Sequence, residues 1–151
     1  MAEQGTVLVP TLSTFHDLAA TKSELYPEVL VEQARRQLEE ANLTLMAARA
    51  AGVTIAMGFD SHPPGAEALE LVRMVEAGLS PMEALTAGTS GSARACGLDD
   101  VGIVRDGAAA DLLLVDGDPA ADVGILGRAD GRWLVVKDGT PIGGTGLQAL
   151  A

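Results

Sequence analysis

Two short apolar runs, separated by a long helical pattern, constrain the fold of this chain most. Residues 6–10 (TVLVP) and 53–57 (VTIAM) are brief and rich in β-branched residues, as is typical of buried strands. Between them, over residues 27–51, apolar side chains recur at three- and four-residue spacing, and Gly52 is placed to end a helix. The recurring residues are Val29, Leu30, Ala34, Leu38, Ala41, Leu45 and Ala48. Strands joined by so long a crossover run parallel, so the pattern predicts an α/β fold.

The remainder of the first 97 residues continues the alternation. Residues 11–26 are expected to form a loop, and residues 66–77 a helix with Leu69 and Val72 on its turns. Ser80, Pro81 and Glu83 have the spacing of a capping box with proline at the first helical position. The small polar segment GTSGS at 88–92 is interpreted as the cap of a further helix over 90–96, with binding of an anion as the less favoured reading.

After residue 98 the pattern changes to short apolar segments separated by glycine turns. Residues 102–104, 110–119 and 132–142 are expected to contain strands, with acid-glycine turns at 106–107, 116–117 and 138–139. We therefore divide the chain into a βα region (1–97), a β lobe (98–143) and a loose tail (144–151). Two βα units cannot close a barrel, so we expect an open strand edge that another part of the protein, a partner or a second copy covers.

Charge and composition narrow the range of partners. The 151 residues carry a net charge of −11, from 21 acidic against 10 basic residues, and this argues against nucleic acid and anionic membranes as partners. No run approaches the length of a membrane span, and the N-terminus lacks the basic start of a signal peptide. The single cysteine, Cys96, excludes an internal disulfide and is interpreted as a small buried residue. These features predict a cytoplasmic protein.

Asp60 is the main candidate for chemistry, because it follows the second predicted strand. In parallel βα architectures the loops after the strands converge, so an acid there can bind a metal or transfer protons. The alternative is a structural role, in which Asp60 caps the next helix or braces the loop. His62 and His16 also lie in loops after the two strands. Together with Asp60 they reach the three ligands of a zinc site only if those loops meet, so whether either histidine lines the site stays open.

Several ordered stretches resemble the C-terminal portion of the amidohydrolase superfamily, with imidazolonepropionase-like and prolidase-like metal-dependent hydrolases as the nearest match. They are AGVTIAMGFDS (51–61), ELVRMVEAGLSPMEALTAGTSGSARACGL (70–98), VGIVRDGAAADLLLVDGDPAADV (101–123) and VVKDG (135–139), together with the opening GTVLVPTLST. The resemblance implies the last βα units of a TIM-like (β/α)8 barrel, followed by part of a small β-sandwich lobe. It also implies a divalent metal, zinc by preference, that activates water to hydrolyse carbon-nitrogen bonds of small amides, dipeptides or cyclic amides.

By this resemblance, Asp60 matches the aspartate at the end of the eighth barrel strand, which binds the metal and shuttles a proton. Phe59 departs from the small or hydroxyl residue usual before it. The family's metal-binding histidines and its middle-strand lysine have no counterpart here, and His16 and His62 do not match those positions. We therefore expect the chain alone to be inactive and to bind little or no metal.

The alternative is a non-catalytic remnant or subunit that associates with a partner or with itself to complete the barrel. The sequence does not identify the substrate, the number of metals or the oligomeric state.

Overall fold

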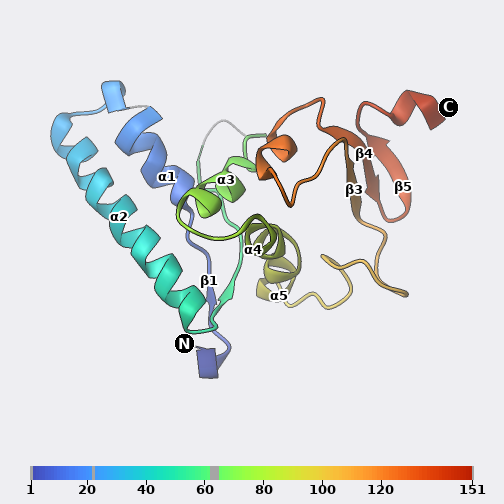
Figure 1. The fold of residues 1–151 in the computed structure, drawn as a ribbon, viewed down its shortest axis with the longest axis horizontal. Coiled ribbons are helices and arrows are strands. Elements are labelled where there is room, and N and C mark those ends of the chain that lie inside the picture. Colours follow the sequence, from blue (N-terminus) through green and yellow to red (C-terminus); the bar gives the residue numbers. More distant parts are fainter. Residues whose placement is uncertain (1, 22, 62–64, 151) are drawn as a thin grey trace.

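A parallel pair of strands joined by a long helix forms the first part of the fold. The computed structural model describes residues 2–21, 23–61 and 65–150. A short 3-10 helix, η1 (Ala2–Gln4), precedes β1 (Val7–Leu8), which pairs in parallel with β2 (Thr54–Ile55), Val7 beside Thr54 and Leu8 beside Ile55. The crossover is α2 (Glu28–Ala50), which runs along one side of the molecule (Figure 1). The α/β class and the parallel pairing are confirmed, although both strands are shorter than predicted.

The helix α2 matches the predicted range of 27–51 closely. It ends in a Schellman arrangement, in which the Val53 N–H donates to the Ala48 carbonyl and Gly52 adopts φ +69°. Its buried side chains are Val31, Ala34, Leu45 and Ala48. The prediction that Val29 and Leu30 share this face was wrong: Val29 is 72% exposed, because Val31 takes the inward position in the first turn.

The segment predicted as a loop over 11–26 is largely helical. It contains α1 (Leu12–His16), a π-helical turn η2 (Asp17–Thr21) and a 3-10 turn η3 (Ser23–Leu25). Thr11 stands at the N-cap of α1 but makes no side-chain capping bond, so local capping does not account for the start of this helix. The partner of the first α1 amides is a carboxylate 57 and 58 positions away in the sequence, so a tertiary contact decides this local structure.

Three helical segments follow β2 along the chain. They are α3 (Leu69–Glu76), α4 (Pro81–Thr86) and α5 (Ser92–Ala95), with the π-helical turn η4 (Ala87–Gly91) between the last two. The capping box at Ser80 and Glu83 is confirmed. The interpretation of 88–92 as a helix cap was wrong, because these residues continue one helical run from α4 to α5. Gly91 is required there, since a Cβ at that position would collide with the Ile55 carbonyl of β2.

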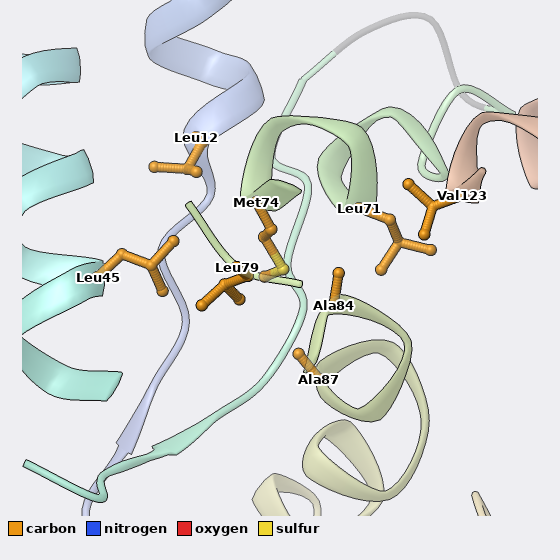
Figure 2. Close-up of a cluster of buried hydrophobic side chains, with 8 residues drawn as sticks. All are labelled: Leu12, Leu45, Leu71, Met74, Leu79, Ala84, Ala87 and Val123. Atoms are coloured by element: carbon orange, nitrogen blue, oxygen red, sulfur yellow. The ribbon is translucent and has the colours of Figure 1, made fainter. Parts of the chain in front are cut away.

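The hydrophobic core lies between α1, α2, α3 and α4 (Figure 2). Its buried members are Leu12, Leu45, Leu71, Met74, Leu79, Ala84, Ala87 and Val123. The inward face of α3 is formed by Glu70, Leu71 and Met74, whereas Leu69, which we had placed on the apolar turns, is 42% exposed. An acid therefore occupies a core position of α3.

The second half of the chain forms a small antiparallel sheet. Its order is β3 (Leu112–Val115), β4 (Arg132–Lys137) and β5 (Thr140–Gly143), with a 3-10 segment η5 (Val123–Gly127) between β3 and β4. The hairpin turn at 138–139 has positive φ at both residues, as its acid-glycine sequence predicts. The strand expected at 102–104 does not form.

The segment predicted as a loose tail begins beside β4. The Gly146 N–H donates to the Trp133 carbonyl of β4, and the 3-10 turn η6 (Leu147–Leu150) follows. The division of the chain at 97/98 and 143/144 stays a prediction.

Cys96, at the end of α5, is exposed, so its interpretation as a buried residue was wrong.

Candidate functional site

The segments that follow the two parallel strands come together around Gly58. A Cβ on Gly58 would lie 2.6 Å from Val9 Cγ1 and 2.9 Å from Thr11 Cγ2, so only glycine fits between them. The Ala56 N–H donates to the Leu8 carbonyl and extends the contact beyond the paired residues. As expected for parallel strands, the loops at their C-terminal ends therefore meet, and Asp60 lies in one of them.

Asp60 is held by its backbone and exposes its side chain. The Thr14 hydroxyl of α1 donates to the Asp60 carbonyl, and it also lies 3.4 Å from the Phe59 carbonyl. The backbone of Asp60 has φ +44°, a left-handed conformation that is uncommon for a residue other than glycine. The carboxylate is exposed at the rim of the strand pair. The geometry thus presents an acid outward from a tightly held turn.

A second bond holds the same loop. Ser61 Oγ donates to Asp17 Oδ2 at 2.6 Å, and Asp17 is the first residue of η2. Consecutive turns of the α1–η2 segment therefore hold residues 59–61 through Thr14 and Asp17. We did not identify either residue from the sequence, because we expected their segment to be a loop.

The two histidines have different outcomes. His16 is the last residue of α1 and is partly buried. Its pKa is lowered from the usual value, first by burial and then by the charge of Arg73, while Glu76 and Asp17 act in the opposite direction. The charged side chains of α3 therefore influence the pKa of His16. His62 lies outside the described residues, so its role stays a prediction.

Glu70 is the most unusual acid of the region, because its side chain is completely buried. Its Oε1 accepts a hydrogen bond from the Leu12 N–H at 2.6 Å, and its Oε2 accepts one from the Ser13 N–H at 2.8 Å. Burial raises the pKa of Glu70, while hydrogen bonds from Ser13 and Leu12 oppose that rise. The spacing in the sequence could have indicated this burial. Glu70 stands four residues before Met74, so the two side chains lie on the same face of α3, which faces the core.

The donor set does not fit a complete metal centre. Within residues 2–21, 23–61 and 65–150, no three His, Cys, Asp or Glu side chains lie together in a way that could hold a metal ion. Asp60 offers one carboxylate, and a catalytic zinc site takes three protein ligands. A hollow of about 300 Å³ opens at the other end of β2, where Arg49, Val53, Leu79 and Glu83 are among its lining residues, and Asp60 does not line it.

These features define an α/β protein in which an exposed acid stands at the carboxyl ends of parallel strands. The model of the amidohydrolase family matches residues 1–142, and the chain therefore belongs to the amidohydrolase family. Members of this family are generally metal-dependent hydrolases. The resemblance noted from the sequence is confirmed.

Individual relatives support the same assignment. An ochratoxinase of Aspergillus niger is 32% identical over 154 aligned positions, which cover 97% of this chain and 31% of that protein. An imidazolonepropionase of Rhodococcus jostii (strain RHA1) is 39% identical over 71 positions, covering 44% of this chain and 17% of that protein. The chain therefore spans about a third of the length of the ochratoxinase.

Solved structures share the fold over nearly the whole chain. The crystal structure of the A. niger ochratoxinase superposes with a TM-score of 0.84 at 28% identity, covering 95% of this chain and 34% of that one. A Xaa-Pro dipeptidase with methionine bound in its active site superposes with a TM-score of 0.80 at 32% identity, covering 95% and 36%. In the part of this chain that the structure describes, no helix has the length and apolar character needed to cross a membrane.

Proposed function

We propose that this chain is the C-terminal portion of a metal-dependent amidohydrolase, in which Asp60 belongs to the reaction centre. In this proposal residues 1–97 supply the last βα units of a TIM-like barrel, residues 98–143 supply part of a β-sandwich lobe, and residues 144–151 form a tail. The metal, zinc by preference, is held mainly by residues outside this chain. A cytoplasmic location remains part of the prediction.

The placement of Asp60 is the observation that carries the proposal. Its carboxylate stands at the carboxyl ends of a parallel strand pair, where α/β enzymes bind their ligands. An exposed carboxylate on a rigidly held turn can bind a cation or accept a proton from a reacting group. The loop is held at Thr14 and Asp17, so the backbone that carries the acid has a defined position.

The names of the relatives indicate the class of substrate. They include a Xaa-Pro dipeptidase, an imidazolonepropionase and a prolidase complexed with N-methylphosphonate-L-proline. We propose that the substrate is a small amide, dipeptide or cyclic amide whose carbon-nitrogen bond is hydrolysed. The isolated chain supplies one candidate ligand, so we expect it to turn over no substrate.

The first experiment measures the chain alone. Calorimetric titration with Zn²⁺ and assays with a Xaa-Pro dipeptide and a lactam should show neither micromolar affinity nor turnover. Hydrolysis by the pure chain would contradict the proposal that the remaining ligands lie elsewhere.

The second experiment reads the coding sequence immediately upstream of Met1. The proposal expects an in-frame HxH motif and two later histidines. In the longer protein, Asp60→Asn should lower kcat by about 10²-fold or more, as expected for loss of a group that transfers a proton. The exposed Asp99→Asn is the matched control and should leave kcat unchanged. Equal kcat values for the two variants would remove Asp60 from the reaction centre.

The alternative is a non-catalytic remnant or subunit that associates with a partner or with itself. One observation favours it: within the described residues β1 pairs only with β2, so the outer edges of this pair lack strand partners. Exposed apolar side chains at Leu25, Val29 and Leu43 lie near or along α2. Sedimentation velocity over a concentration series, together with thermal unfolding, tests it. A species that stays monomeric and unfolds in one sharp transition would count against this alternative.

A further inference from the structure

Glu70 has no role in the proposed chemistry, yet it is an acid that occupies a core position. We propose that Glu70 is a positioning residue for Asp60, which it reaches through the first turn of α1 and the hydroxyl of Thr14. The consequence for catalysis rests on the proposed function of Asp60, whereas the mechanical link between the two acids does not.

The first link joins α3 to α1. Both carboxylate oxygens of Glu70 are used, one on the Leu12 N–H and the other on the Ser13 N–H, at 2.6 and 2.8 Å. The helix α1 has only five residues and lacks a side-chain cap at Thr11, so it has little means of holding its own first turn. Glu70 supplies the acceptors that the N-cap residue does not.

The second link joins α1 to the loop that carries Asp60. Thr14 directly follows Ser13, and its hydroxyl donates to the carbonyl of Asp60. One turn further along, Asp17 accepts the hydrogen bond from Ser61. The contacts therefore run from Glu70 to residues 12 and 13, and from residues 14 and 17 to residues 60 and 61. A displacement of the first α1 turn would move both holding points of the loop.

The backbone of Asp60 explains why such support is needed. A residue other than glycine at φ +44° is less stable than in the common regions by about 1 kcal/mol or more, and it stays there only when its surroundings enforce it. An apolar residue at position 70 would fill the same volume without the desolvation that raises the pKa of Glu70. It would, however, leave two adjacent N–H groups of α1 buried without acceptors.

The test measures the two links in this chain. Glu70→Gln keeps the volume but leaves one acceptor oxygen for two N–H groups, and Glu39→Gln changes an exposed acid of α2 as a control. In Glu70→Gln, hydrogen exchange at the Leu12 and Ser13 amides should rise about tenfold, and the amide resonances of Asp60 and Ser61 should shift. Glu39→Gln should leave these signals in place.

A double-variant cycle separates positioning from general loosening. In a background that carries both Thr14→Val and Ser61→Ala, the two hydrogen bonds that hold the loop are cut. Glu70→Gln should then no longer shift the Asp60 resonance, while it still accelerates exchange at residues 12 and 13. Leu134→Ala, which destabilises the remote sheet, should not reproduce the shift. The proposal is overturned if Glu70→Gln leaves residues 60 and 61 unchanged, or shifts them equally in both backgrounds.

Activity in the longer protein gives an independent measure. Glu70→Gln should lower kcat about tenfold with KM unchanged, because a misplaced Asp60 affects the reaction more than substrate binding. An unchanged kcat, where Asp60→Asn is strongly impaired, would overturn the catalytic part of the inference. If Asp60→Asn is itself harmless, the proposed function fails, and the cycle in this chain still decides whether Glu70 positions Asp60.

Discussion

The helical region and the three-stranded sheet bury their apolar residues to very different extents. Seven of the eight members of the central cluster come from residues 12–87, and Leu12, Leu45, Met74 and Ala84 are completely buried. In the sheet, Leu134 is buried, whereas Leu113, Leu114, Trp133 and Ile142 are each more than a third exposed. The helices therefore supply most of the hydrophobic stabilisation, although both regions keep some large apolar side chains exposed.

The two regions are joined by η5. Val123 is the eighth member of the cluster and comes from the segment between β3 and β4. Figure 2 shows it beside Leu71 of α3, at the edge of the core. The Asp122 side chain accepts a hydrogen bond from the Gly124 N–H and fixes the start of η5. The segment η5 therefore anchors the sheet to the helices.

The largest effect is expected for Leu45→Ala in the helical region. Leu45 lies on α2 and is completely buried against the other members of the core cluster. Its truncation should therefore lower the free energy of unfolding by about 2–5 kcal/mol. Urea denaturation followed by circular dichroism measures this change. A loss below about 1 kcal/mol would show that the cluster is not the main source of stability and would remove the contrast between the regions.

A smaller effect is expected for Val123→Ala, which tests the anchor between the regions. Removing two buried methyl groups should cost about 1–2 kcal/mol. If η5 couples the regions, hydrogen exchange should accelerate in β3 and β4 as well as around Leu71. Faster exchange on one side only would show that the sheet and the helices unfold independently.

A pH-dependent contribution is expected from Glu83 within the helical region. A hydrogen bond from Arg49, followed by hydrogen bonds from Ser80, lowers the pKa of Glu83 to about 2. The folded-state pKa lies below the ordinary value of 4.5, so the stabilisation is complete above pH 4.5 and disappears as the pH falls toward 2. The difference in stability between wild type and Glu83→Gln should therefore narrow as denaturation is measured from pH 7 down to pH 3.

Ser80→Ala is the control for that measurement. It removes the N-cap of α4, which should cost about 1 kcal/mol, and one of the lesser hydrogen bonds that lower the pKa of Glu83. It leaves the backbone hydrogen bond from Ser80 and the ion pair of Arg49 with Glu83 in place. Wild type and this variant should differ by a more nearly constant amount over the same pH range. A gap between wild type and Glu83→Gln that is constant with pH would show that the ion pair between α2 and α4 contributes no stability.

Local signals and long-range contacts explain which features could be predicted from the sequence. The helix α2, the capping box at Ser80 and the turn at 138–139 follow from periodicity and short-range chemistry, and all three were predicted. The helix α1 was missed because its capping group, Glu70, lies far away in the sequence. Asp60 is a site candidate from the sequence because a predicted strand precedes it. Thr14 and Asp17 hold its loop through tertiary hydrogen bonds that no local pattern encodes.

The smallest effect is expected for Leu113→Ala in β3. This side chain is 45% exposed, so truncation should change the stability of the monomer by less than about 0.5 kcal/mol. Leu134→Ala, from the buried face of the same sheet, is the matched control and should cost about 2 kcal/mol or more. Both are measured by urea denaturation at low and high protein concentration. If Leu113→Ala costs more at high concentration, the exposed face of the sheet is buried by another copy, and this apolar face is an interface.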